Sequence, residues 1–179
     1  MTTTSPIKIE VPGSGDAEGI AAVLVETRLN AYRSDELDIT EEDLSARFGG
    51  VDETVVVVRR WLNDGEKRRL WVVRDGPAVV GMCVAYHDEN GGHVGAVYVL
   101  PLYQGRGIGK QLMQAALEWL GDAEDIALWA ATYVPKPIEF YRRLGFIESG
   151  VTRQFALTHD KPMPLLQMIK RRGGPRPSP

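Results

Sequence analysis

The sequence is short of the residues that build disulfides, metal sites and membrane spans. Among 179 residues it has one cysteine, Cys83, which excludes an internal disulfide framework and a cysteine-based zinc site. His87, His93 and His159 lack the spacing of a zinc-binding helix, so no metal is expected. No stretch approaches the ~18 uninterrupted apolar residues of a membrane helix. Residues 1–6 have neither the basic start nor the apolar run of a secretion signal. We therefore expect a cytoplasmic protein with no membrane partner.

An excess of charge of one sign is also lacking, since 21 basic and 24 acidic residues give a net charge of -3. The distribution is uneven: residues 16–66 carry 13 acids against 5 bases, and residues 136–179 carry 9 bases against 3 acids. The two regions could attract ligands of opposite charge, although solvated helix faces give the same pattern. The C-terminal bases are not interleaved with aromatics, so nucleic acid is not an expected partner. The length fits one domain over residues 1–170, followed by a disordered basic, proline-rich tail over 171–179.

Alternating apolar residues and helix-capping patterns predict an α/β (α+β) fold, with a mixed central sheet of about seven strands flanked by four or so helices. Strands are expected over 7–11, 70–73, 79–86, 93–100 and 126–132, from Phe146 onward, and over 165–169. Helices are expected after Asp16, after Thr40, from about Gly107 to Leu120, and from Pro135 to Gly145. The run Thr54–Val58 favours a strand by propensity, but acids before it and bases after it suit a capped helix, which we predict.

The segment from Val97 to Lys110 carries the clearest chemical signal. A strand ends at Pro101, a glycine-rich turn follows, and a helix begins at about Gly107. Glycines let a ligand approach the backbone closely, and the first helical turn has free N–H groups. Together with Arg106 and Lys110, these groups predict a site for an anion, and phosphate in particular.

Two common phosphate-binding motifs do not fit this turn. A P-loop would need glycine where Gln104 stands, and serine or threonine where Gln111 stands. A dinucleotide fingerprint that began at Gly105 would need glycine in place of Lys110, and it belongs after the first strand of a chain. Both nucleotide interpretations therefore fail on spacing.

The spacing Gln104-x-x-Gly107-x-Gly109 resembles the GNAT superfamily of acyl-CoA-dependent N-acetyltransferases. The resemblance extends to Val99-x-Pro101-x-Tyr103 before the turn and to Glu139-Phe-Tyr-Arg-Arg-Leu-Gly-Phe146 after it. It implies a GNAT-like domain from residue 7 to about residue 170. It also implies an enzyme that transfers an acetyl group from acetyl-CoA to an amine.

The resemblance implies a place for each part of acetyl-CoA. The strand Val97-Tyr98-Val99 would pair with the pantetheine arm like an added strand. Backbone amides of the turn would hold the pyrophosphate; the residues implied are Gly105, Arg106, Gly107, Ile108, Gly109 and Lys110. Gln104, the first residue of the motif, is implied as a further cofactor-binding residue. The sequence departs from the family pattern at Val134, where the family often has asparagine.

The resemblance also implies that Tyr141 lies near the thioester sulfur and assists the departure of the thiolate, although a tyrosine here could be a core aromatic. The general base is less defined. His93 begins the strand that leads to the cofactor, and imidazole is the side chain used most often as a general base. Glu26 and Glu89 are the other candidates.

The acidic region 16–66 falls on the side that, by resemblance, binds the acceptor. It favours a cationic amine on a small molecule or peptide, and Tyr32 could line its pocket. The alternative is a non-catalytic acyl-CoA-binding or sensing domain. Homodimerisation would follow if the apolar late strands paired across subunits.

Overall fold

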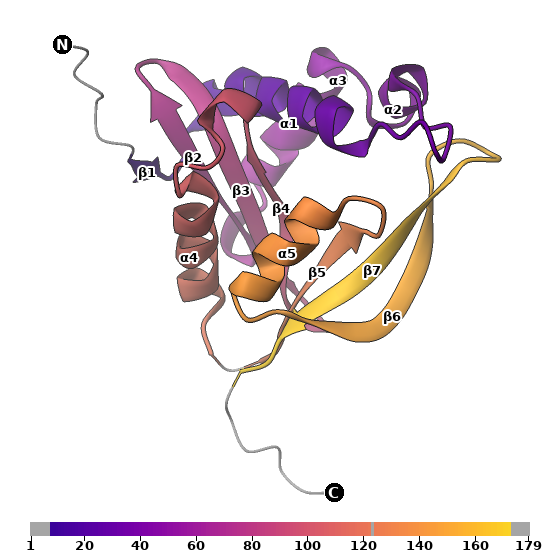
Figure 1. Ribbon diagram of the computed structural model, residues 1–179. Helices are drawn as coiled ribbons and strands as arrows, with labels where there is room; N and C mark the ends of the chain where they lie inside the picture. The colour runs from indigo at the N-terminus through magenta and orange to yellow at the C-terminus, as the bar shows by residue number, and fades with distance from the viewer. Residues whose placement is uncertain (1–7, 123, 173–179) are drawn as a thin grey trace, which may run out of the picture.

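The computed structural model describes residues 8–122 and 124–172, which form one seven-stranded sheet with helices on both faces (Figure 1). The strands are β1 (Ile9–Glu10), β2 (Arg68–Asp75), β3 (Ala78–Asp88), β4 (Gly91–Val99), β5 (Ile126–Ala131), β6 (Ile147–Ala156) and β7 (Pro162–Lys170). The α-helices are α1 (Ala17–Tyr32), α2 (Glu41–Phe48), α3 (Val51–Leu62), α4 (Ile108–Leu120) and α5 (Pro135–Arg143). The predicted mixed sheet is confirmed, with five α-helices where four or so were expected.

The strand order is β1-β2-β3-β4-β5-β7-β6, and all pairs are antiparallel except β4 with β5. Helices α1 and α3 bury their apolar faces against β2 and β3 on one side of the sheet. Helices α4 and α5 pack on the other side (Figure 1). Both faces of the central strands are therefore covered, which matches their almost continuous apolar runs.

Helix α3 forms from the β-branched run, as predicted, because capping and helical spacing outweigh strand propensity. The backbone N–H of Gly50 donates to Oε2 of Glu53 at 2.9 Å, which satisfies one of the free amides at the helix start. Val55 and Val58 lie on the buried face, whereas Val56 is 60% exposed. The valines thus follow the period of an amphipathic helix.

Asp16 precedes α1 as expected, but its carboxylate does not cap this helix. It accepts a hydrogen bond from the backbone N–H of Gly13 at 2.8 Å and one from Arg74 at 2.5 Å. Arg74 also binds Glu10 at 3.2 Å, so Asp16 ties the segment before α1 to β2 and β1. By contrast Thr40 caps α2 as predicted, since its Oγ1 accepts from the backbone N–H of Asp43 at 3.2 Å.

Strands β4 and β5 form hydrogen-bonded pairs over only a short stretch. In the part of the chain that the structure describes, they pair only at Gly92–Ile126 and His93–Ala127. On its other edge β4 pairs with β3 along its whole length, with Gly95 as an extra residue in a β-bulge. Beyond His93, β4 and β5 therefore diverge, and the edge of β4 that faces β5 stays open as far as Val99.

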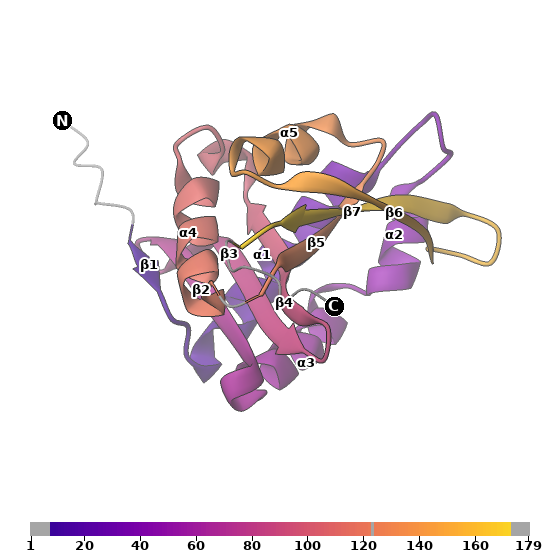
Figure 2. The ribbon, with the colours of Figure 1, turned by 90° about the horizontal axis from the view of Figure 1, so that it is seen from below.

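The β6–β7 hairpin extends beyond the sheet and meets α2 (Figure 2). Lys161 Nζ lies 3.0 Å from Oδ2 of Asp38 and 2.9 Å from Oδ2 of Asp43. Phe48 of α2 stacks on Phe155 of β6 with ring centroids 5.9 Å apart. Arg47 of α2 also donates to the carbonyl of Ala156 at 3.1 Å, so an ion-pair cluster, an aromatic pair and this hydrogen bond hold the hairpin to α2 and the loop before it.

This cluster should make the stability of the protein depend on acid pH. Hydrogen bonds from the backbone of Thr40 and from Lys161 lower the pKa of Asp43 to about 2. Stability from this group is present above the unfolded pKa of about 3.9 and is lost as the pH falls through the folded value. We expect the free energy of unfolding, measured by urea denaturation, to fall between about pH 4 and pH 2. The fall should be shallower in Asp43→Asn.

Asp35→Asn is a matched control for this prediction, because the Asp35 side chain makes no hydrogen bond within the described residues. It should keep the pH dependence of the original protein. An Asp43→Asn variant with that same dependence would contradict the assignment.

The start of the predicted tail is bound to the domain. The backbone N–H of Arg172 donates to Asp125 at 3.0 Å, and its guanidinium donates to Asp122 at 2.6 Å. The remainder of the predicted tail, 173–179, lies outside the described residues. Within the described ranges, no helix has the length and apolar character needed to cross a bilayer.

Candidate functional site

A cleft of about 460 Å³ lies between the glycine-rich turn and α5. It is floored by the end of β4, and its walls are the start of α4 and one side of α5. Eight of the residues predicted to bind the cofactor line it: Val97, Val99, Gln104, Gly105, Gly107, Ile108, Gly109 and Lys110. Tyr98 and Arg106 do not. The structure therefore brings most of the predicted turn and strand to one cavity.

The glycines of the turn open its backbone toward this cleft. Gly105 and Gly107 have φ values of +76° and +78°, the left-handed region that favours glycine. A Cβ added at either position would meet no protein atom within 4 Å. The first helical hydrogen bond of α4 runs from Gln111 to Gly107, so the amides of Ile108 and Gly109 have no helical partner. The turn can therefore accept an anion.

Neighbouring side chains hold the turn in place. Gln104 Nε2 donates to the carbonyl of Val99 at 2.9 Å, which fixes the turn to the end of β4. Tyr103 donates its hydroxyl hydrogen to Asp75 at 2.7 Å. Arg106 lies over the ring of Tyr103, with its Cζ 5.2 Å from the centroid.

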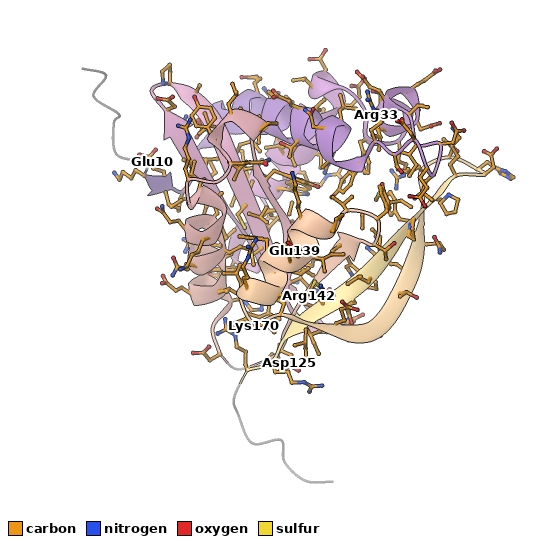
Figure 3. All side chains as sticks on the ribbon, in the orientation of Figure 1. Glu10, Arg33, Asp125, Glu139, Arg142 and Lys170 are labelled. Atoms are coloured by element: carbon orange, nitrogen blue, oxygen red, sulfur yellow. The ribbon has the colours of Figure 1, made fainter. Side chains whose placement is uncertain are left out.

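The cleft is bordered mainly by positive charge. Lys110, Lys136 and Arg143 line it, together with one acid, Glu139. Glu139 lies on α5 near Arg142, which is paired with Glu148 (Figure 3). Three cations against one carboxylate favour an anionic ligand.

A second, smaller cavity of about 140 Å³ lies at the same gap between β4 and β5. It shares five lining residues with the cleft: Val97, Val99, Gln104, Pro137 and Tyr141. Its other walls come from α1, from β4 and β5, and from the loop before α5, and include Thr27, Ala31, Tyr32, Tyr98, Trp129 and Val134. The two cavities therefore meet at the open edge of β4, one toward α4 and the other toward α1.

Three tyrosines, Tyr32, Tyr98 and Tyr141, face this second cavity. The hydroxyl oxygens of Tyr32 and Tyr98 lie 2.8 Å apart, and Tyr133 donates its hydroxyl hydrogen to the backbone carbonyl of Tyr32 at 2.9 Å. Tyr141 is 9% exposed, and burial raises the pKa of its hydroxyl, as it does that of Tyr32. Both groups therefore stay protonated at neutral pH, and each can donate a hydrogen bond.

The structure does not bring His93 to either cavity. Its Nε2 lies 2.9 Å from Oδ1 of Asp88, and its ring stacks on Tyr86 with centroids 5.0 Å apart. His93 belongs to the closed end of the β4–β5 gap, where the strands still pair. Of the other candidate bases, Glu89 lies in the turn between β3 and β4, and Glu26 lines a separate hollow.

The sequence interpretation missed Trp129, which lines the second cavity. The alternation of side chains along β5 could have indicated it. Leu128 and Ala130 point into the core on the α4 side, so Trp129 between them must point to the opposite face. A large aromatic on that face, away from the main core, would have been a reasonable site candidate.

The described residues contain no group of three or more His, Cys, Asp or Glu side chains that could hold a metal ion. Neither cavity has a set of ligands for one.

Comparison with known proteins gives a family and a fold. Residues 66–148 match the family model described as an acetyltransferase (GNAT) domain. No curated protein matches the sequence. The resemblance to the GNAT superfamily is thereby confirmed over the segment that contains β2 to α5.

Solved structures share the fold over nearly the whole chain. The paia N-acetyltransferase from Thermoplasma acidophilum, in complex with coenzyme A, has a TM-score of 0.71 and 17% identity, covering 93% of this chain and 99% of its own. YncA, a putative acetyltransferase from Salmonella typhimurium with acetyl-CoA, has a TM-score of 0.72 and 15% identity, covering 98% of each chain. The ribosomal-protein-S18-alanine N-acetyltransferase from Escherichia coli has a TM-score of 0.65 and 17% identity, covering 97% of this chain and 99% of its own.

Proposed function

We propose that this protein, with a GNAT acetyltransferase domain over residues 66–148, is an N-acetyltransferase that moves an acetyl group from acetyl-CoA to an amine. One observation carries the proposal: two cavities meet at the open edge of β4, beside Tyr141. A thioester held in the larger one would expose its carbonyl carbon to an amine in the smaller one. Direct transfer in a ternary complex follows from this arrangement.

The larger cleft suits coenzyme A. The unpaired edge of Val97–Val99 offers backbone groups to the two amides of pantetheine. The unpartnered amides at the start of α4 and the open space over Gly105 and Gly107 suit the pyrophosphate. Two of the similar solved structures hold coenzyme A or acetyl-CoA, which supports this assignment.

In the proposed reaction the neutral acceptor nitrogen bonds to the acetyl carbon, the carbon–sulfur bond breaks, and coenzyme A leaves as a thiolate. The proton that the nitrogen then loses passes to this thiolate or to water, which gives the amide and free coenzyme A. Tyr141 would donate a hydrogen bond to that sulfur. A free thiol has a pKa of about 8.5, and the pKa of Tyr141 is raised above that of an ordinary tyrosine. Complete proton transfer from Tyr141 to the thiolate is therefore unfavourable, and its contribution is a hydrogen bond.

The acceptor amine would be deprotonated without a dedicated protein base. No carboxylate or imidazole is among the residues that line the second cavity. Burial disfavours a charged amine, so the cavity itself favours the neutral, nucleophilic form. We assign no catalytic role to His93.

Acidic residues would draw the amine toward this side of the protein while it is still a cation. A hollow of about 460 Å³ at the end of α1 is lined by Glu26, Asp35 and Glu41, with Arg33 as its basic member (Figure 3). A cationic amine on a small molecule or peptide remains the proposed acceptor. The alternative function, an acyl-CoA sensor without activity, is favoured only by the lack of a base in the second cavity.

A thermal-shift titration with coenzyme A and acetyl-CoA tests the proposal, with ATP and NAD as controls. At 100 times the dissociation constant, one bound ligand stabilises the folded protein by about 2.7 kcal/mol, which raises the melting temperature measurably. Thiol release that requires an added amine then separates the enzyme from the sensor. No shift with coenzyme A, or a shift with ATP instead, would refute the assignment of the cleft.

A further inference from the structure

Arg153 stacks on a tryptophan that lines the second cavity. The Cζ atom of Arg153 lies 4.1 Å from the ring centroid of Trp129, the tryptophan that lines this cavity. Arg153 is on β6 and pairs with Leu165 of β7, which in turn pairs with Ala131 of β5. Its side chain therefore extends across β7, on the face of the sheet that carries α1, and stacks on the ring of Trp129 in β5.

Nothing in the described part of the chain neutralises Arg153. No acid forms an ion pair with it, and its guanidinium makes no hydrogen bond. Two other ring-stacked arginines have polar partners: Arg68 binds Asp64 at 2.6 Å, and Arg47 donates to the carbonyl of Ala156 at 3.1 Å. Arg28 and Arg106 stack on rings without such a partner among the described residues, as Arg153 does. Arg153 is exposed and stacked on Trp129, with its N–H donors open to solvent and to a ligand.

The charge of Arg153 also reaches the opposite side of the β4–β5 gap. Burial raises the pKa of the Tyr86 hydroxyl on β3, and the positive charge of Arg153 opposes that rise. Tyr86 stacks on His93 at the closed end of this gap, so the charge of Arg153 acts on that end as well as on Trp129.

We propose that Arg153 determines acceptor specificity by binding a carboxylate, so that the acceptor is a small amino acid with both an amine and a carboxylate. The proposal rests on the proposed function and names its acceptor class. A guanidinium offers a planar pair of donors that fits a carboxylate, and its stacking on Trp129 fixes that plane before the ligand arrives. The absence of carboxylates among the cavity residues means that nothing there repels the anion. The acidic hollow would draw the ammonium group of the same molecule to this side of the protein before the amine loses its proton and enters the second cavity.

A panel of α- and ω-amino acids, each paired with its own amide, tests this inference by thiol release at saturating acetyl-CoA. We expect kcat/KM for the preferred amino acid to exceed that for its amide about 10–100-fold, the usual effect of a charge-assisted hydrogen bond. Arg153→Gln should remove this preference. Arg153→Lys, which keeps the charge but not the planar pair, should be intermediate.

Arg60→Gln on the exposed face of α3 is the matched control and should keep the preference. An unchanged coenzyme A thermal shift in Arg153→Gln shows that the variant is folded and that the cofactor site is intact. Amides as active as acids, or an equal loss for acid and amide in Arg153→Gln, would overturn the inference while leaving an acetyltransferase. Thiol release with no amine at all would overturn the proposed function, and this inference with it.

Discussion

Replacing Gly107 by alanine is expected to weaken coenzyme A binding about 10–100-fold, the effect of losing one or two charge-assisted hydrogen bonds. Gly107 has φ +78° and precedes the first turn of α4, where the amides are unpartnered. An alanine Cβ would project into open space over the turn, where the proposed pyrophosphate lies. The left-handed backbone would also become strained, at about 1 kcal/mol. The dissociation constant is measured by isothermal titration with coenzyme A.

Gly121→Ala separates the loss of binding from the strain. Gly121 ends the same helix at φ +73°, and a Cβ there would also meet no protein atom within 4 Å. Helix α4 has 13 residues, so this control lies about 20 Å from the turn. It should lose stability at least as much as Gly107→Ala and bind coenzyme A normally. If both variants bind alike, the turn does not hold the phosphates.

Tyr141→Phe is expected to lower kcat about 10–100-fold and to leave coenzyme A binding almost unchanged. Tyr141 borders both cavities, and its raised pKa keeps the hydroxyl protonated. The change removes one hydrogen bond to the departing sulfur, but a thiolate remains a fair leaving group without it. Initial rates of thiol release at saturating acetyl-CoA and acceptor measure the effect.

Tyr86→Phe is the control for the removal of a phenol. Tyr86 stacks on His93 and lines neither cavity, so its replacement should leave kcat within about twofold. A Tyr141→Phe variant with the original kcat would show that this hydroxyl takes no part in the rate-limiting step. A large rise in the dissociation constant of coenzyme A, at unchanged kcat, would instead assign Tyr141 to cofactor binding.

The elements of the fold could be predicted because their signals are local. Thr40 and Gly49 mark the two ends of α2, and the glycine turn marks the start of α4. Even the valine run of α3 was predictable, because acids before it and arginines after it suit the dipole of a helix. Each of these signals lies within a few residues of the element that it predicts.

The divergence of β4 and β5 has no such local signal. It depends on which residues of β5 pair with β4, and β5 begins 27 residues after Val99, beyond α4. The position of β7 between β5 and β6 likewise depends on pairing between residues that are distant in the sequence. Periodicity within a strand cannot specify either one.

The contrast between local signals and long-range pairing also explains why the larger cleft could be predicted from the sequence and the second cavity could not. The larger cleft is largely one continuous segment, Val97–Lys110, whose residue types and spacing could be interpreted together. The second cavity combines Tyr32, Tyr98, Trp129 and Val134 from three distant elements and a loop. His93 is a candidate from the sequence because it carries an imidazole and begins β4, but β4 pairs with β5 at that residue, away from the opening.

The open edge of β4 has a consequence for aggregation. Unpaired strand edges invite pairing with other chains, and proteins usually shorten or interrupt them. The outer edges of this sheet follow that rule: β1 has two residues, and β6, with Ile147 and Val151 about half exposed, is interrupted by a bulge. The edge of β4 is instead internal, with β5 and α5 beside it. A single extended ligand can reach it, but the edge of another sheet cannot.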